Sequence, residues 1–310
     1  MLGRIVEIEG EGRRLSLERG FLAVSGPDGT LGKVPLDDIE AVILSHPATS
    51  FTGQALSALA EHGAPVVICG GNFKPAAYLL PVDGHHAQAD RIEAQAQAAL
   101  PLKKRLWAQI VRAKILAQAD ALNRAEAAQQ GLPALAARVR SGDPGNIEAQ
   151  AAQRYFPAMF GKTFTRSHGD DPINAMLNYG YTVLRAATAR AIVAAGLHPS
   201  LSIAHQSRGD ALRLADDMME PFRPTVDLTV RALIDLAHRD MDPPTKRALA
   251  LVLHADFETA EGVTPLSNVL ARLCVSLAQV FTGERKTLLL PKTTIPIDAT
   301  PENDGAAAEI

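Results

Sequence analysis

The segment LSIAHQSRGDALRLADDMMEPFRP at 201–224 concentrates side chains that can bind a cation or carry a proton. His205 precedes an expected helix at 209–220, whose acids are Asp210, Asp216, Asp217 and Glu220. Residues three or four apart lie on one helix face, so Asp217 and Asp216 both neighbour Glu220. Grouped carboxylates repel unless a cation relieves them, and His with carboxylates is a ligand set for Mg²⁺ or Mn²⁺. The segment predicts a divalent-metal site, whereas the alternative is an Arg213–Asp217 pair on a solvated surface.

A further acid, Glu148, falls in the first turn of a second expected helix at 146–156, directly after the turn residues GDPGN. Its neighbours one turn on are Ala151 and Ala152, so a long ligand could approach the backbone on that face. The helix dipole also favours an acid at this position without any function. On its own, Glu148 is therefore no evidence of a site.

The chain has a net charge of −3, yet Lys and Arg dominate residues 101–166, where four acids stand against eleven bases. Such a local excess predicts a phosphate-rich partner such as the DNA backbone. A solvated helical face accounts for the same charges equally well. The candidate DNA-binding residues are Lys103, Lys104, Arg112, Lys114, Arg138, Arg140 and Arg166.

Several other function classes are disfavoured. GPDGTLGKV at 26–34 is no phosphate-binding P-loop, because its glycine spacing is one residue too long and Val34 replaces the Mg²⁺-binding Ser or Thr. No nucleotide or organic cofactor is therefore expected. Cys69 and Cys274 lie in apolar runs outside any CxxC pattern, which indicates buried thiols in a reducing compartment. Without a signal core or a membrane-length apolar stretch, we expect a soluble, cytoplasmic protein.

The elements that must position these residues change character near residue 86. Before it, short alternating strands surround one helical stretch at 51–63, which predicts a small, mostly antiparallel β domain at 1–85. After it, an Ala-rich pattern predicts a larger all-α catalytic domain at 88–288, and its first long helix covers 102–131. The remaining expected helices are 146–156, 172–195, 209–220, 225–239, 244–256 and 265–282. The fold class is thus α+β, with an aperiodic tail at 289–310 that we expect to be disordered.

Four strings together resemble the CRISPR-associated adaptation integrase family, and specifically its catalytic subunit. They run in order as IEAQAAQRYF around Glu148, DPINAMLNYGYTVLR at 171–185, LHPSLSIAH ending at His205, and LADDMMEPFRP around Glu220. The helix LWAQIVRAKILAQADAL before them is also similar. EPFRP after the acidic helix looks most like the form found beside type II CRISPR effectors. The sequence departs from the family at Gly209 and Asp210, where relatives often carry an Asn and an aromatic residue.

The resemblance implies a β domain joined to a helical catalytic domain, with a metal on Glu148, His205 and Glu220. These three residues would be catalytic, and Asp217 matches a further acid of the family. The implied reaction is transesterification, in which a DNA 3′-hydroxyl attacks a phosphodiester so that a short fragment enters the CRISPR repeat array. The implied partners are double-stranded DNA, a second copy of the chain, and a small ferredoxin-like subunit in a heterohexamer.

Within LADDMME we expect Glu220 to be the direct ligand, because its longer side chain projects from a helix end fixed by Pro221. Asp217 is expected to play a secondary role. Two rival functions remain: a metal-dependent nuclease that only cuts DNA, and a DNA-binding scaffold whose acids are surface charge.

Overall fold

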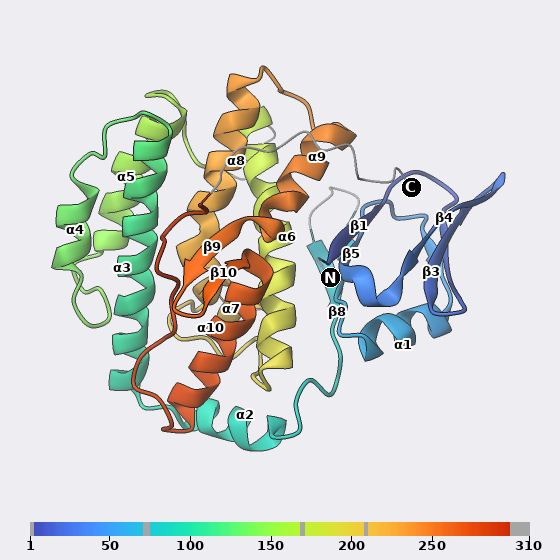
Figure 1. The fold of residues 1–310 in the computed structure, drawn as a ribbon, viewed down its shortest axis with the longest axis horizontal. Helices are drawn as coiled ribbons and strands as arrows, with labels where there is room; N and C mark the ends of the chain where they lie inside the picture. Colours follow the sequence, from blue (N-terminus) through green and yellow to red (C-terminus); the bar gives the residue numbers. More distant parts are fainter. Residues whose placement is uncertain (1–2, 71–74, 168–170, 208–209, 298–310) are drawn as a thin grey trace. The chain divides into compact units, whose positions relative to one another are not determined.

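The computed structural model describes residues 3–70, 75–167, 171–207 and 210–297. Contacts divide the chain after His86 into two units, Met1–His86 and Ala87–Pro301. The first is built mainly from strands and the second mainly from helices (Figure 1). The predicted order of a β-rich part followed by a mostly helical part is confirmed.

Two four-stranded sheets form the first unit, with the orders β1-β5-β7-β8 and β4-β3-β2-β6. The strands are β1 (Arg4–Ile8), β2 (Arg14–Glu18), β3 (Phe21–Gly26), β4 (Gly29–Pro35), β5 (Ile39–Leu44), β6 (Ser50–Phe51), β7 (Val66–Cys69) and β8 (Pro75–Leu79). A short 3-10 turn, η1 (Leu36–Asp38), lies between β4 and β5.

These sheets are mixed, which corrects the prediction of a mostly antiparallel domain. Strands β1 and β5, β5 and β7, and β2 and β6 pair in parallel. The antiparallel pairs are β2 with β3, β3 with β4, and β7 with β8. Helix α1 (Gly53–Glu61) lies between β5 and β7 in the chain, and such a crossover returns the chain in the same direction. Alternating patterns reveal the strands but not their direction.

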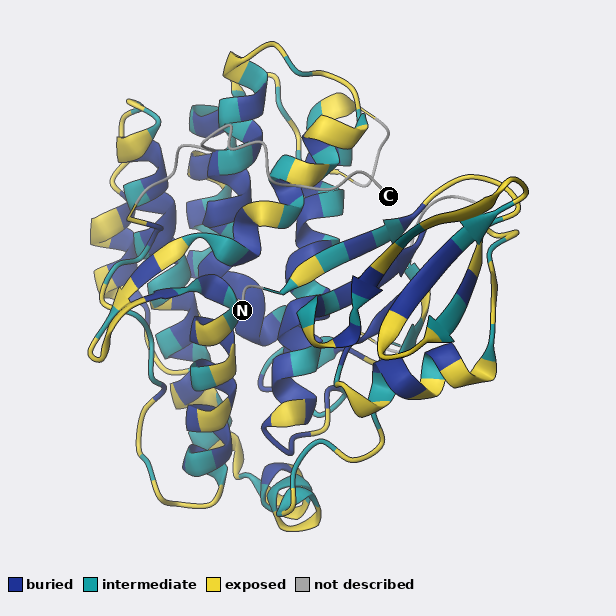
Figure 2. Cartoon of the chain, turned by 45° about the vertical axis from the view of Figure 1, so that its right-hand side comes forward, coloured by how far each residue is buried: buried dark blue, intermediate teal, exposed yellow. Residues whose placement is uncertain are grey.

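The helical unit contains the candidate site residues. Its helices are α2 (Gln88–Gln97), α3 (Leu100–Arg124), α4 (Leu132–Arg138), α5 (Ile147–Phe160), α6 (Pro172–Ala194), α7 (Arg213–Met219), α8 (Arg223–Asp235), α9 (Pro243–Ala250) and α10 (Leu266–Phe281), with 3-10 turns η2 (Glu220–Phe222) and η3 (Leu251–His254). Helix α3 packs against α4, α5, α8 and η2. Its buried Val111, Ile115 and Leu122 join Tyr155 and Met159 in one core, which appears dark in Figure 2.

Two helix predictions are corrected. The expected long helix at 102–131 ends at Arg124 in the structure, and Glu126, Gln130 and Gly131 adopt positive φ before α4 begins. The catalytic domain is also not all-α, because an antiparallel hairpin of β9 (Asp256–Thr259) and β10 (Gly262–Pro265) follows η3. At the turn of this hairpin Gly262 adopts a φ of 115°, which β-branched or bulky residues rarely reach.

The segment after α10 differs from the expected disordered tail as far as residue 297. The Leu288 amide donates to Gln109 at 3.0 Å, and the Leu289 amide donates to Ser276 at 2.9 Å. Ile295 is buried against the core of α3 to α5. Apolar residues spaced along an extended chain lack helical periodicity, so the sequence did not reveal this packing. Residues 298–310 lie outside the described residues.

Candidate active site

Lys114, Glu148 and Glu220 meet inside the helical unit. The Nζ atom of Lys114 lies 2.6 Å from Oε1 of Glu148 and 2.5 Å from Oε2 of Glu220. The side chain of Lys114 is 13% exposed and that of Glu220 is 5% exposed. The Glu148 side chain is 25% exposed. Two carboxylates that are 72 positions apart in the chain therefore share a single, largely buried ammonium group.

Asp143 fixes the position of Glu148. Helix α5 begins after Asn146, whose side chain makes no capping hydrogen bond. Instead, the buried carboxylate of Asp143 accepts hydrogen bonds from the amides of Ile147 at 2.9 Å and Glu148 at 3.0 Å. The first amides of a helix lack internal partners, so this contact anchors the turn that carries Glu148.

Glu220 lies where α7 passes into η2, and η2 packs against α3. Its Oε1 atom is 3.0 Å from Nε of Arg223, while Oε2 faces Lys114. Burial alone raises the pKa of Glu220, but Arg223 and Lys114 outweigh it and lower that pKa to about 2. The carboxylate is therefore ionised at neutral pH.

His205 is held by Asp217, the fully buried acid of α7. Oδ1 of Asp217 lies 2.7 Å from Nδ1 of His205 and accepts the backbone amide of His205 at 3.1 Å. Oδ2 accepts the amides of Ile203 at 2.6 Å and Ala204 at 3.2 Å. The hydrogen bond to Asp217 raises the pKa of His205. When Nδ1 donates to a carboxylate, the neutral ring presents a lone pair at Nε2, as metal-binding histidines do.

The His205 ring also meets α3 and lies on an anchored loop. Trp107 packs edge-on against it, with ring centroids 5.7 Å apart. Earlier in the loop, the buried Gln95 of α2 donates to the carbonyls of His198 at 3.1 Å and Leu201 at 2.7 Å. The alternative pair of Arg213 with Asp217 does not form, because Arg213 donates to the Ser200 carbonyl at 2.8 Å and Asp217 is surrounded by the His205 loop.

Arg185 of α6 holds the acids that flank this loop. Its guanidinium contacts Asp210 at 2.6 Å and Asp216 at 2.8 Å. Asp216, a helical neighbour of Glu220 in the sequence, is thus paired with Arg185. Neither Asp210 nor Asp216 contacts Lys114 in the described hydrogen bonds and ion pairs, so these two acids form a cluster separate from Glu148 and Glu220.

A buried network supports Arg223. Asp227 of α8 accepts hydrogen bonds from Tyr155 of α5 at 2.8 Å and from Tyr181 of α6 at 2.5 Å. The Arg223 guanidinium lies 4.6 Å from the centroid of the Tyr181 ring. This network links three helices to the arginine that contacts Glu220.

The predicted DNA-binding residues fall into two groups. Lys104, Arg138 and Arg140 are exposed and Lys103 is half-buried, so all four can reach a partner. Lys114, which we expected to contact DNA, lies against the carboxylates of Glu148 and Glu220. Arg166 donates to Asn174 and Asn178 at 2.8 and 2.7 Å, and Arg112 donates to the Val139 carbonyl at 2.9 Å.

The donor set suits a hard divalent cation. Glu148 and Glu220 offer carboxylate oxygens and His205 offers an imidazole nitrogen, the ligand types that Mg²⁺ and Mn²⁺ accept. Within the described ranges, no three His, Cys, Asp or Glu side chains converge closely enough to coordinate an ion. The Lys114 ammonium lies between the two carboxylates instead, which shows that this space already attracts a cation.

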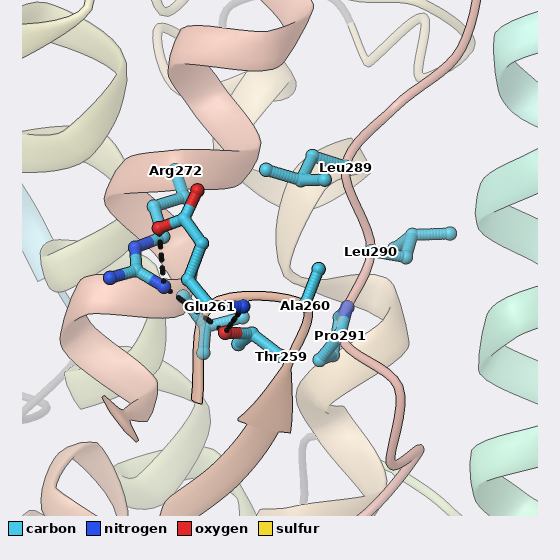
Figure 3. Close-up of a pocket in the computed structure, with 8 residues that line it drawn as sticks. Thr259, Ala260, Glu261, Arg272, Leu289, Leu290 and Pro291 are labelled. Atoms are coloured by element: carbon cyan, nitrogen blue, oxygen red, sulfur yellow. Dashed lines mark hydrogen bonds and ion pairs between the residues drawn. The ribbon is translucent and has the colours of Figure 1, made fainter. Parts of the chain in front are cut away.

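A hollow elsewhere in the unit is too small for a substrate. It lies between the β9–β10 hairpin, α10 and the segment 289–291, and its volume is about 20 Å³, room for roughly one water molecule (Figure 3). Arg272 there pairs with Glu261 at 3.2 Å and donates to Thr259 at 3.1 Å. None of the candidate catalytic residues lines it.

Sequence patterns missed several residues that build the site: Gln95, Trp107, Asp143, Arg185 and Arg223. Asp143 ends the turn signal SGD shortly before α5, so a capping role was detectable. Arg223 lies three residues after Glu220, the spacing of a local ion pair. Gln95 and Arg185 act over 25 positions or more, and no local pattern encodes such contacts.

The fold and site define a protein of two units, whose helical unit brings Glu148 and Glu220 together on Lys114 and holds His205 against Asp217. Residues 6–256 match the family described as CRISPR associated protein Cas1. The chain is 43% identical over 247 residues to a CRISPR-associated endonuclease Cas1 of Neisseria meningitidis serogroup C (strain 8013), covering 78% of this chain and 81% of the relative. A Pyrobaculum aerophilum relative described as CRISPR-associated endonuclease Cas1 2 is 30% identical over 285 residues, covering 87% and 96%. The chain belongs to the Cas1 family, which confirms the resemblance drawn from its motifs.

Solved structures share the fold. A casposase bound to integration product has a TM-score of 0.76 at 21% identity, covering 92% of both chains. A CAS1 protein from Thermotoga maritima has a TM-score of 0.70 at 15% identity, covering 92% of this chain and 98% of that one. A chain of a Cas6-RT-Cas1–Cas2 complex has a TM-score of 0.74 at 20% identity, covering 93% of this chain and 36% of that one. Separately, no helix among the described residues is long and apolar enough to cross a membrane.

Proposed function

We propose that this chain is the catalytic subunit of CRISPR adaptation, a divalent-metal-dependent DNA endonuclease and integrase. The observation that carries the proposal is the convergence of Glu148 and Glu220 on one cation-binding position, with His205 held nearby in the helical domain. Membership of the Cas1 family supports it, as do curated relatives described as CRISPR-associated endonucleases. The identity of 43% to the Neisseria relative also supports the type II form.

In this proposal Glu148, Glu220 and His205 hold the metal, which is Mg²⁺ or Mn²⁺. When bound, such an ion neutralises phosphate charge and makes a nearby hydroxyl more acidic. Asp217 takes the proton-bearing Nδ1 of His205 as its partner and so keeps Nε2 available. Arg223 keeps Glu220 ionised and oriented through its 3.0 Å contact.

The reaction exchanges one phosphodiester bond for another. A DNA 3′-hydroxyl attacks a phosphodiester of the repeat array, its proton leaves, and a different 3′-oxygen departs as a hydroxyl. The number of phosphodiester bonds is unchanged, so no nucleotide hydrolysis is needed. The bases Lys103, Lys104, Arg138 and Arg140 would bind the DNA backbone without reading sequence.

The proposed assembly is a homodimer that joins a small ferredoxin-like subunit in a heterohexamer on double-stranded DNA in the cytoplasm. Support comes from a chain of similar fold in the Cas6-RT-Cas1–Cas2 complex.

A strand-transfer assay tests the proposal against its rivals. The chain is incubated with Mn²⁺, a short DNA duplex and a supercoiled plasmid carrying the repeat, with and without the small subunit. Joined products at the repeat are expected, and Glu148→Gln, His205→Ala or Glu220→Gln should abolish them while circular dichroism stays native. The matched control is Asp235→Asn, an exposed acid of α8.

Each rival has its own outcome in this assay. Cut plasmid without joined ends would favour a nuclease, and DNA binding without any cleavage or joining would favour a scaffold. Full activity in all three site variants would contradict the shared site itself.

A further inference from the structure

Lys114 differs from the other bases of α3 in its surroundings. Lys104 and Arg105 on the same helix are exposed, whereas the Lys114 side chain is 13% exposed and ends between Glu148 and Glu220. Buried lysines are rare because losing hydration disfavours the charged ammonium. Both carboxylates lie within 2.6 Å of Nζ, so the charge is compensated where it stands.

The charges of this cluster balance without any metal. Glu148 and Glu220 carry one negative charge each, and Lys114 and Arg223 carry one positive charge each. A divalent cation added between the same oxygens would meet the ammonium at contact distance, and two cations in one largely buried space repel strongly.

We propose that Lys114 is a built-in counter-cation that holds the Glu148–Glu220 pair together in the metal-free protein and must leave this position when a divalent cation binds. Lys114 is thus a positioning residue that competes with the metal. The inference rests on the proposed function, because it takes Glu148 and Glu220 as the ligands. Only molecules in which the ammonium is displaced can bind the metal. The apparent affinity for the metal is therefore reduced in proportion to the fraction of such molecules.

Lysine is a side chain that allows this displacement. Its ammonium is a compact point charge on a flexible four-carbon stem, so rotation about the stem can move it without moving α3. The backbone that carries Glu148 is anchored by Asp143, and the Glu220 carboxylate also contacts Arg223. Both acids therefore remain at the position that a divalent cation would take when the ammonium moves away.

The test compares wild type with Lys114→Met, which keeps a long, flexible side chain and removes its charge. Lys162→Met, at an exposed lysine after α5, is the matched control. Mn²⁺ affinity is measured by titration calorimetry, and thermal melts are recorded in EDTA and in saturating Mn²⁺. We expect Lys114→Met to bind Mn²⁺ about tenfold more tightly than wild type. In EDTA it should melt at a lower temperature, and Mn²⁺ should raise its melting temperature more than that of wild type.

A double-mutant cycle in EDTA isolates the counter-cation role. Lys114→Met should destabilise the metal-free protein strongly in the wild-type background and much less with Glu148→Gln, because one of the two unpaired carboxylates is then neutral. If Lys114→Met does not fold in EDTA, Mn²⁺ should restore its fold. Failure to fold in both conditions would contradict the proposal.

The outcomes separate this inference from the proposed function. If wild type binds Mn²⁺ and Lys114→Met binds it equally tightly or more weakly, then only the competition between Lys114 and the metal is overturned. If neither protein binds Mn²⁺, or if Glu148→Gln does not reduce the binding, then the metal site of the proposed function is overturned instead. In that case the double-mutant cycle in EDTA still decides whether Lys114 is the counter-cation. If Lys114→Met destabilises the Glu148→Gln protein as much as it destabilises wild type, the counter-cation role is rejected.

Discussion

The carboxylate of Asp217 accepts hydrogen bonds from three backbone amides and lies against the His205 ring. An asparagine at this position would replace one of the two carboxylate oxygens with an NH₂ group, a hydrogen-bond donor that would face other donors. In the structure this acid holds the His205 loop and the orientation of its ring. Its secondary role at the metal stays a prediction. Glu220, in contrast, directs its oxygens at Lys114 and Arg223.

We therefore predict that Asp217→Asn lowers strand transfer by about 10-fold to 100-fold, the range found when partners of metal-binding histidines are removed. The melting temperature should also fall, because a fully buried polar group loses its complementary partners. Strand-transfer rates and thermal melts measure the two effects, with Asp235→Asn as the exposed control. Wild-type activity in Asp217→Asn would show that the His205 orientation does not depend on this carboxylate.

At the scale of elements, α6 and α8 approach each other at a glycine. A Cβ atom added at Gly180 would lie 2.5 Å from Cγ1 of Val226, closer than side-chain carbons pack. We expect Gly180→Ala to destabilise the helical unit by about 1–3 kcal/mol, as overpacking does. Urea unfolding followed by the fluorescence of the single tryptophan, Trp107, reports on this unit. Val226→Ala should destabilise the protein less in the Gly180→Ala background than in wild type, and additive losses would show that the contact is not responsible.

The Tyr155–Asp227–Tyr181 network links α5, α6 and α8 and makes stability depend on pH. Burial raises the pKa of Asp227 to about 6 despite the hydrogen bonds from Tyr181 and Tyr155. A raised pKa in the folded state means that the folded protein retains a proton that the unfolded chain releases at lower pH. Its stabilising contribution is therefore present below about pH 4 and is lost as the pH rises from about 4 through 6.

We predict that wild type loses about 3 kcal/mol relative to Asp227→Asn between about pH 4 and pH 7. The comparison cancels groups common to both proteins. Urea unfolding at several pH values, followed by Trp107 fluorescence, measures the difference. A difference that stays constant over this range would mean that Asp227 titrates normally.

At the scale of the whole molecule, the net charge of −3 conceals the local excess of Lys and Arg at 101–166 that we propose to bind DNA. Three of the seven predicted bases have partners in the structure: Arg112 donates to Val139 while remaining exposed, Lys114 contacts Glu148, and Arg166 donates to Asn174. We expect the phosphate contacts to come chiefly from the other four bases. Their charges are screened by salt, which makes the affinity for DNA fall as the salt concentration rises.

Neutralising these four bases should reduce the slope of log affinity against log salt by up to about 0.9 for each phosphate that is no longer neutralised. The variant replaces Lys103, Lys104, Arg138 and Arg140 with Gln. Fluorescence anisotropy with a labelled duplex over a range of salt concentrations gives the slope. The control removes the same number of charges at exposed bases outside the segment, Arg14, Arg239, Arg247 and Lys286. Equal slopes in both variants would return the basic segment to ordinary solvated surface.

The sequence by itself determined what local periodicity and motif spacing encode. Helical spacing placed the acids of LADDMME relative to one another, and four ordered motifs identified the family that the comparisons show. It also separated a β-rich part from a helical part, because the two periods differ. Strand direction and the packed segment up to residue 297 depend on distant partners, and the strands of the hairpin after η3 are only four residues long, too short to show a clear alternation. These predictions needed correction.

Only the tertiary structure decided which charges meet. A local rule pairs Arg213 with Asp217 across one helical turn, yet Asp217 faces the His205 loop and Arg213 a backbone carbonyl. In the sequence Lys114 is one of many bases on α3, and only the packing of α5 and η2 brings Glu148 and Glu220 to its ammonium. A charged side chain takes the partner that packing places within reach, and buried packing excludes the water that would otherwise satisfy it.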